Sequence, residues 1–229
     1  MLLPKGVKYK NEFLAQSIML EQALKFFIVF FVVVEPLTLI PVFSGLTEGA
    51  NAAYRHKMAL KSVLVASGII LLFAFVGAGF LSALGISIDS FRIFGGLLLF
   101  LIALEMVFAR ESGTRTSSEE KVESKNRADI SVFPLAFPFM AGPGALTTIL
   151  LWFGPISVTQ HPLQFLLMFA CAIAVLACCL FAMWVAEPLM NIMGVTGTNV
   201  ANRLFGVVLG ALAVQFIVDG VRASFGIGQ

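Results

Sequence analysis

The sequence predicts an all-α polytopic membrane protein, in which six transmembrane helices form two inverted three-helix repeats with helices one and four broken. Three observations predict this class: the composition, the number of long apolar segments, and a repeat within the chain. Of the 229 residues, 59% are hydrophobic and only 12% are charged, and the mean hydropathy is +0.96. Soluble domains carry charge on about a quarter of their residues, so lipid is the expected solvent for most of this surface.

Six apolar segments have about the length that a helix needs to cross a bilayer. They are residues 26–46, 63–84, 91–108, 132–153, 165–185 and 204–221. A serine-rich polar stretch separates the third segment from the fourth, and its composition has no core-forming pattern. The chain is therefore divided into a first repeat (1–109), a polar linker (110–129) and a second repeat (130–229).

The chain repeats itself in two pairs of segments. FRIFGGLLLFL (91–101) aligns without gaps with NRLFGVVLGAL (202–212), and EPLTLIP (35–41) has the same Pro-x4-Pro spacing as FPFMAGP (137–143). An odd number of spans in each copy turns the second copy upside down in the membrane. Inverted repeats with interrupted helices in matching positions are typical of secondary transporters, whose substrate site lies near the midplane between the repeats.

The first segment carries two prolines and a carboxylate near its middle. Pro36 and Pro41 lack the N–H groups of a continuous helix and free the carbonyls four residues earlier; Thr38 lies between them. Because a charged Glu35 at mid-membrane is expensive, we expect it to be protonated, paired or in contact with a wet cavity. It would then act as a proton carrier, an ion ligand or a partner for an ammonium group. The alternative is a structural hydrogen bond to the broken backbone of the other repeat.

The fourth segment carries the matching break, FPFMAGPGALTT (137–148). Its prolines again free carbonyls, and its glycines permit an unwound backbone beyond which a helix can restart. The free N–H groups near residues 145–147 would form the positive end of a helix dipole, which suits an anionic group. The predicted carboxylate cradle consists of Pro138, Gly142, Pro143, Gly144, Thr147 and Thr148. The alternative is a proline kink that packs against its neighbours and binds nothing.

Four polar residues on the third and sixth segments form a candidate pathway or gate. Two are arginines at matching positions of the repeat, at predicted helix N-termini, where the dipole disfavours a cation. We expect Asp89 to compensate the first arginine and Glu187 the second. The other two residues are four apart and share one helix face, where they line the path or bond between helices. The four are Arg92, Arg203, Gln215 and Asp219.

Two further features are predicted to serve packing. Gly206 and Gly210 form a GxxxG pair that lets another helix approach closely, within the protomer rather than in a dimer. Cys171, Cys178 and Cys179 lie in one apolar run, so neither a disulfide framework nor a metal site is expected.

Lysine and arginine are divided unevenly between the two ends of the predicted bundle. Nine lie on the linker side: Arg55, Lys57, Lys61, Arg110, Arg115, Lys121, Lys125, Arg127 and Arg203. Six lie on the other side: Lys5, Lys8, Lys10, Lys25, Arg92 and Arg222. The positive-inside tendency therefore predicts a cytoplasmic linker, with both termini on the opposite side.

Four segments carry a resemblance to a known family: EPLTLIPVF, LGISIDSFRIFGGLLL, PLAFPFMAGPGALTT and NRLFGVVLGALAVQFIVDG. They resemble the MarC family of bacterial inner-membrane proteins, and the match extends from Phe26 to Val221 with few interruptions. The resemblance implies a multi-pass protein of the inner membrane with six helices and periplasmic termini. It also implies transport of small neutral amino acids such as glycine and alanine. Glu35 stands where family members often have Asp or Asn, and Thr38 stands where they often have Gly.

The predicted function is transport of a small zwitterionic amino acid, coupled to H⁺ or Na⁺, with no enzymatic activity and no cofactor. The carboxylate would bind the helix N-terminus of the fourth segment, and the ammonium would bind Glu35 and freed carbonyls. The alternative is export of a metal ion or another small solute, although divalent cations want more carboxylates than Glu35 alone. Membrane lipids are expected partners, and the net charge of +2 is too small for a nucleic-acid surface. The sequence leaves homo-oligomerisation open.

Overall fold

The computed structural model describes residues 5–108, 129–156 and 160–226, and all regular secondary structure in this part of the chain is helical. The elements are α1 (Lys5–Val34), α2 (Leu39–Leu46), α3 (Ala52–Ala83), α4 (Ile88–Phe108), η1 (Ser131–Met140), α6 (Pro143–Phe153), α7 (Pro162–Trp184) and α8 (Ala186–Phe225). The predicted polar linker lies outside the described residues, apart from Asp129 at its end.

Among the described residues, five helices are long and apolar enough to cross a membrane. A sixth crossing results if η1 and α6, which are bent by 56° relative to each other, count as one span. The predicted all-α polytopic class is therefore confirmed. The first span differs in extent, because it covers Gln16–Val34 rather than 26–46. Residues 11–25 contain neither glycine nor proline, so the helix continues toward the N-terminus instead of starting at the apolar run.

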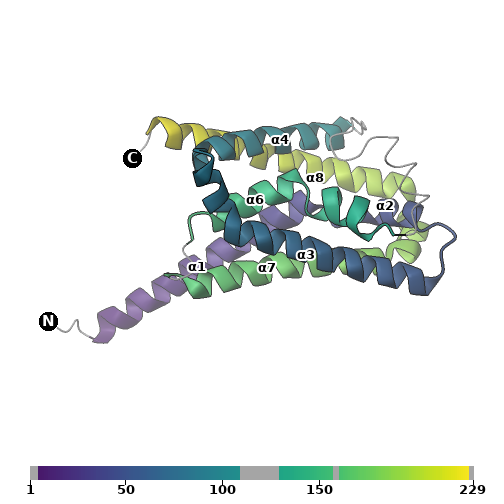
Figure 1. The fold of residues 1–229 in the computed structure, drawn as a ribbon, viewed down its shortest axis with the longest axis horizontal. Coiled ribbons are helices and arrows are strands. Elements are labelled where there is room, and N and C mark those ends of the chain that lie inside the picture. Colours follow the sequence, from purple (N-terminus) through teal and green to yellow (C-terminus); the bar gives the residue numbers. More distant parts are fainter. Residues whose placement is uncertain (1–4, 109–128, 157–159, 227–229) are drawn as a thin grey trace.

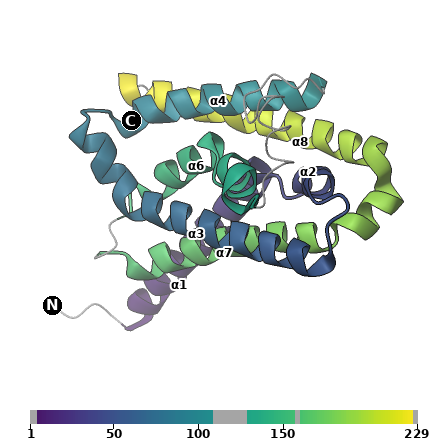
Figure 2. The same cartoon turned by 45° about the vertical axis from the view of Figure 1, so that its right-hand side comes forward.

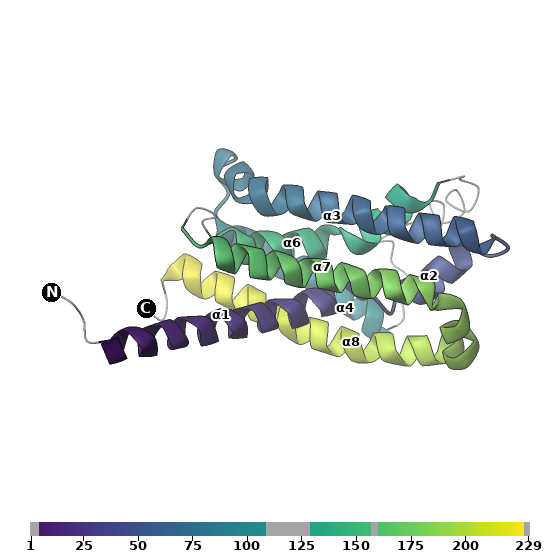
Figure 3. The same ribbon diagram turned by 90° about the horizontal axis from the view of Figure 1, so that it is seen from below.

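The broken elements lie between two pairs of long helices. α4 packs along α8 on one side of the bundle, and α3 packs against α7 on the other (Figure 1). Figure 2 shows η1 and α6 in the interior, between these pairs, and most residues of α6 are buried. The beginning of α1 and the end of α8 lie at one end of the bundle, whereas α2 lies at the other (Figure 3). The two ends of the described chain thus lie at the same end of the bundle, as expected if η1 and α6 form one span.

The start of η1 is held by a short polar network. The carboxylate of Asp129 accepts hydrogen bonds from the hydroxyl of Ser131 at 2.6 Å and from its backbone N–H at 3.0 Å. Lys61 of α3 forms an ion pair with the same carboxylate. Lys61 and Ser131 together hold the pKa of Asp129 well below its usual range. This network ties the first turn of the broken span to α3.

Glycine residues let α4 and α8 approach closely. A Cβ atom on Gly206 would lie 2.8 Å from the Cβ of Met106 and 3.1 Å from the carbonyl oxygen of Ala103. On α4, a Cβ on Gly96 would lie 2.8 Å from the carbonyl oxygen of Ala213. The GxxxG pair therefore packs against α4 of the same chain, as predicted.

Gly206→Ala is expected to lower the free energy of unfolding by about 1–3 kcal/mol, the usual cost of overpacking. The added methyl group meets the Cβ of Met106 and the backbone of Ala103, which cannot move away unless the two helices separate. Gly210→Ala is the matched control, because its Cβ would lie at an ordinary 3.5 Å from the Cβ of Ala103. Thermal unfolding of the two purified variants measures the difference. Equal midpoints would contradict this description of the interface.

Candidate functional site

The fourth apolar segment breaks between η1 and α6. η1 is not a regular helix, because Phe133 and Phe137 have extended backbone conformations, with φ/ψ of −127°/127° and −127°/128°. Each precedes a proline, and a proline disfavours the helical conformation of the residue before it. α6 then begins at Pro143, a position where the missing N–H is not needed, and Gly142 is its extended N-cap. The predicted unwinding at this position is confirmed.

The N-terminus of α6 presents backbone N–H groups. The N–H of Leu146 donates to the carbonyl of Gly142 at 2.9 Å. The amides of Gly144 and Ala145 precede this bond, at positions where an α-helix has no i−4 acceptor for its N–H groups. They stand at the positive end of the helix dipole. The amides without a helical acceptor are therefore those of residues 144 and 145, slightly earlier than the predicted 145–147.

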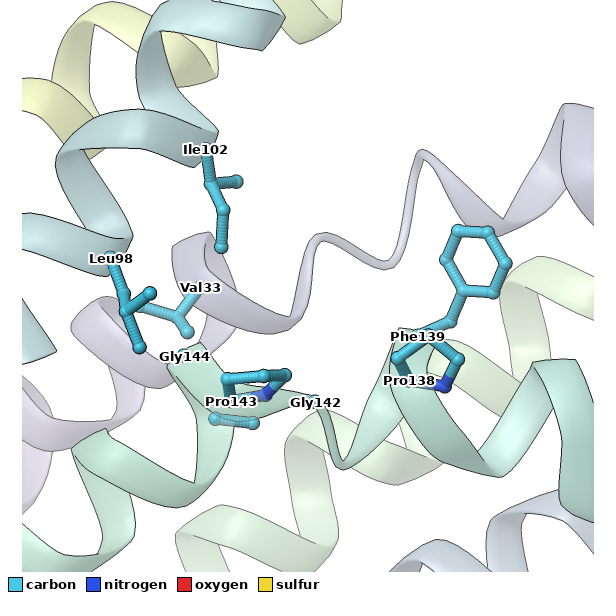
Figure 4. Close-up of a pocket in the computed structure, with 9 residues that line it drawn as sticks. Val33, Leu98, Ile102, Pro138, Phe139, Gly142, Pro143 and Gly144 are labelled. Carbon is cyan, nitrogen blue, oxygen red and sulfur yellow. The ribbon is translucent and has the colours of Figure 1, made fainter. Parts of the chain in front are cut away.

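A pocket of about 50 Å³ lies beside this helix end. A single water needs about 10–15 Å³ on the same measure, so there is room for a small solute. Figure 4 shows Leu98 and Ile102 of α4 on one side of the pocket and the Gly142–Gly144 backbone on the other, with Phe139 beyond. The full lining is Val33, Leu98, Ile102, Pro138, Phe139, Gly142, Pro143, Gly144 and Ala145. The pocket thus combines apolar walls with the amides of a helix N-terminus.

Gly144 leaves room in this pocket because it has no side chain. A Cβ at this position would lie 2.8 Å from Cδ2 of Leu99, 3.3 Å from Cγ1 of Val33 and 3.7 Å from Cδ1 of Ile102. Two of these three neighbours line the pocket. Any larger residue at position 144 would therefore press on the pocket wall and take up part of its volume.

The two threonines of α6 are placed in helix packing. The hydroxyl of Thr148 donates to the carbonyl of Gly144 at 2.9 Å. The methyl group of Thr147 packs on Gly95 of α4, where a Cβ would lie only 1.8 Å from it. Both threonines are buried, and neither is among the described residues that line the pocket. Thr147 thus packs α6 against α4 and Thr148 bonds within α6, whereas the sequence predicts that both hydroxyls are offered to a ligand.

The first apolar segment breaks at Glu35. This residue has a φ of +53°, which is uncommon for a residue with a side chain and costs about 1–3 kcal/mol. Its backbone is nevertheless held, because its N–H donates to the carbonyl of Phe31 and its carbonyl accepts from the N–H of Thr38, both at 3.0 Å. Pro41 lies in the first turn of α2, where proline is tolerated. Pro36 is thus the proline that makes the break.

A second pocket, of about 10 Å³, adjoins this first break and has room for about one water. Glu35, only 5% exposed, lies in it beside Thr38 and Asn202. The Thr38 hydroxyl oxygen is 3.0 Å from Oε2 of Glu35 and 3.2 Å from Oδ1 of Asn202. One hydroxyl carries one proton, so it donates to the carboxylate and accepts from Asn202 when the carboxamide presents its NH₂ group. The remaining lining is Phe31, Val32, Pro36, Leu37 and Phe205.

The two breaks form separate pockets. Val33 lines the first pocket and Val32 lines the second, so the pockets lie on different sides of the last turn of α1. The first opens toward α4, through Leu98 and Ile102, and the second toward α8, through Asn202 and Phe205. The sequence predicts one site in which Glu35 and the α6 amides hold the same ligand. The structure places Glu35 in the second pocket only.

The two repeated arginines have different environments. Arg92 lies in the second turn of α4, and its Nη1 is 3.7 Å from Oδ1 of Asp89, as predicted. Arg203 is exposed and lies well inside α8 rather than at a helix N-terminus, because no proline interrupts residues 189–202. The predicted pairing of Glu187 with Arg203 is wrong, since Glu187 forms its ion pair with Arg55 of α3.

The remaining two candidate gate residues bond to each other. Nε2 of Gln215 donates to Oδ1 of Asp219 at 2.8 Å, which confirms that they share one face of α8. Among the described residues, neither they nor the two arginines line either pocket. The sequence analysis did not identify a different polar residue, which does line the second pocket.

That residue is Asn202, and the internal repeat contains a signal for it. The alignment of the repeats pairs Asn202 with Phe91 and Glu35 with Phe137. In both pairs a polar residue replaces an aromatic one, and the two polar residues meet at the Thr38 hydroxyl. A search for polar residues at positions where the other repeat is apolar would have identified this cluster.

Comparisons with known proteins give a consistent family assignment. Residues 20–225 match the family described as "MarC family integral membrane protein". The chain is similar to the UPF0056 membrane protein YhcE of Escherichia coli K12, with 39% identity over 88% of this chain and 92% of that protein. It is also similar to UPF0056 membrane proteins of Buchnera aphidicola from Schizaphis graminum (35% identity, 88% and 92% coverage) and of Methanocaldococcus jannaschii (34%, 85% and 93%). These names state no substrate. No solved structure matches the chain.

Proposed function

Since the chain belongs to the MarC family of integral membrane proteins, we propose that it is a secondary transporter of small neutral amino acids of the glycine and alanine type. The observation that carries the proposal is the first pocket, where the N-terminus of α6 meets a space of about 50 Å³ inside the helix bundle. Helix N-termini bind anionic groups through their free amides and dipole. Interrupted helices supply such ends for substrate carboxylates in transporters.

The chemistry of the pocket fits both ends of a zwitterion. The amides of Gly144 and Ala145 are placed to donate to a carboxylate. Phe139 also lines the pocket, and its carbonyl has no helical donor because Pro143 lacks an N–H; it can accept from the ammonium group. The walls of Val33 and Ile102 suit a hydrogen atom or a methyl group as the substrate side chain. The volume disfavours larger side chains.

The inverted repeat belongs to this proposal, with copies at 1–109 and 130–229. Two pairs of corresponding helices contact each other, namely α3 with α7 and α4 with α8. Each break also faces the third helix of the other copy, which is α4 for the break before α6 and α8 for the break after α1. In such proteins, alternating access arises when one repeat rocks against the other around a fixed site.

We assign the protein to the bacterial inner membrane, with both termini in the periplasm. The excess of lysine and arginine on the linker side supports this orientation, and the bundle places the two ends of the described chain together (Figure 3). In intact cells without native cysteines, Phe225→Cys should react with a membrane-impermeant thiol reagent and Lys57→Cys should not. The reverse pattern would invert the assignment.

Uptake by proteoliposomes tests the function. Purified protein should catalyse exchange of radiolabelled glycine against internal glycine, and an inward H⁺ or Na⁺ gradient should drive accumulation above equilibrium. Unlabelled alanine should compete, whereas leucine and glutamate should not, because they exceed the pocket or add a charge. Absence of glycine and alanine exchange in vesicles that contain folded protein would contradict the proposal. Flux of a metal ion under the same conditions would favour the exporter alternative.

A further inference from the structure

Resting on the proposed function, we propose that the second pocket, at the break after α1, binds the coupling cation, and that the amino acid occupies the first pocket alone. The cation is a sodium ion or a proton, and the charged ligand is Glu35. Asn202 and Thr38 complete the site.

The ligands of this pocket are oxygen atoms. The hydroxyl oxygen of Thr38 lies 3.0 Å from the carboxylate of Glu35 and 3.2 Å from the carboxamide of Asn202. Val32 also lines the pocket, and its carbonyl has no helical donor because Pro36 lacks an N–H. The volume of about 10 Å³ accommodates one particle of the size of a water molecule. Unwound carbonyls and helix C-terminal ends of this kind coordinate Na⁺ or H⁺ in interrupted transporter helices.

The local charge also calls for a cation. Glu35 directly follows the last residue of α1, at the negative end of the helix dipole, where a second negative charge is unfavourable. Glu35 is only 5% exposed, so bulk water contributes little at this position. The first pocket has the opposite polarity, because it lies at the positive end of α6. The two pockets therefore suit ligands of opposite charge.

The arrangement also explains how the two ligands are coupled. Val32 and Val33 are consecutive residues of the last turn of α1, and each lines one of the pockets. A cation that holds Glu35 and the Val32 carbonyl in place also fixes the Val33 wall of the substrate pocket. Coupling between two such sites is reciprocal, so each ligand raises the affinity for the other.

Thermal unfolding of the purified full-length chain, without any amino acid, tests the site. At pH 8 we compare sodium chloride with choline chloride at equal ionic strength, and in choline chloride we compare pH 8 with pH 6. If sodium is the ligand, a concentration ten times its Kd should raise the midpoint by roughly 3–6 °C. If a proton is the ligand, acidification should raise it instead. Glu35→Gln should remove the response in either case, whereas Glu48→Gln, which changes an exposed carboxylate after α2, should keep it.

Asn202→Ala distinguishes the two cations. It removes an oxygen ligand of sodium and should weaken a sodium response, but it should leave a proton response on Glu35 in place. A wild-type midpoint that is insensitive to sodium and to pH would overturn the proposal, as would equal responses of the wild type and Glu35→Gln.

The outcome separates this site from the proposed transport function, because no amino acid is present. A cation response that depends on Glu35, together with absence of glycine exchange, leaves the cation site standing and removes the substrate assignment. Glycine exchange without any cation response would contradict the cation site and leave the substrate assignment standing.

Discussion

Gly144→Val is expected to weaken glycine binding by at least about 100-fold, since hydrogen bonds to a charged group contribute about 1.5–3 kcal/mol each. Its Cβ would lie 3.3 Å from Cγ1 of Val33, and its two methyl groups would fill the space beside the Gly144 and Ala145 amides. The carboxylate could then no longer reach those donors. Equilibrium binding of radiolabelled glycine to the purified variant measures the effect.

Folding of this variant must be checked, because the new Cβ would lie 2.8 Å from Cδ2 of Leu99. That atom is the end of a flexible side chain and can move, and Gly144→Ala presses on it with a single methyl group. We expect Gly144→Ala to fold and to lose a smaller part of the affinity. Gly79→Val is the matched control, because nothing lies within 4 Å of its Cβ position. Unchanged glycine affinity in a folded Gly144→Val would remove the substrate from this pocket.

Glu35→Gln is expected to abolish gradient-driven accumulation of glycine while exchange of glycine across the membrane continues. Glutamine keeps the shape of the side chain and a hydrogen bond with Thr38, but it has no charge for a cation to neutralise. If sodium is the coupling cation, the glycine affinity of this variant should equal that of the wild type without sodium, a difference that is typically 5- to 150-fold for coupled sites. If a proton is the coupling cation, the affinity should equal that of the protonated wild type, because glutamine resembles a protonated glutamate. Parallel assays of exchange and of accumulation in proteoliposomes separate the two effects.

Glu48→Gln should accumulate glycine like the wild type, since its carboxylate is exposed in the turn after α2. If Glu35→Gln accumulated glycine equally well, Glu35 would be a structural hydrogen-bond partner of Thr38 and nothing more. Loss of exchange as well as accumulation would place Glu35 in direct contact with the substrate, as the sequence alone suggests.

Features set by local rules could be predicted from the sequence. Pro36 and Pro143 lack backbone N–H groups whatever the packing of their helices, so both breaks were predictable from the sequence. Asp89 and Arg92 are three residues apart and pair across one helical turn. The small residue at 206 indicated a close helix contact, which the structure places against α4. Composition and segment length were enough to indicate a polytopic membrane protein.

Features set by the rotation and contacts of whole helices could not be predicted in this way. Val32 and Val33 are adjacent in the sequence, yet a helix turns by about 100° per residue, so they line different pockets. Which pocket receives Glu35 depends on the packing of α8, through Asn202, against the break. The threonine at 147 packs on Gly95, a contact between segments more than fifty residues apart. Local pattern carries no information on such pairings.

The most direct test of the central claim asks whether the α6 amides recognise a carboxylate in the first pocket. In a chain with Cys171, Cys178 and Cys179 replaced by alanine, Leu98→Cys places a thiol in the pocket wall, and Ser90→Cys places one on the exposed start of α4 as control. Glycine should slow the alkylation of Leu98→Cys several-fold. Glycinamide, which lacks the carboxylate, should not slow it. The alkylation of Ser90→Cys should respond to neither compound. Equal protection by glycine and glycinamide, or no protection by glycine, would contradict the account.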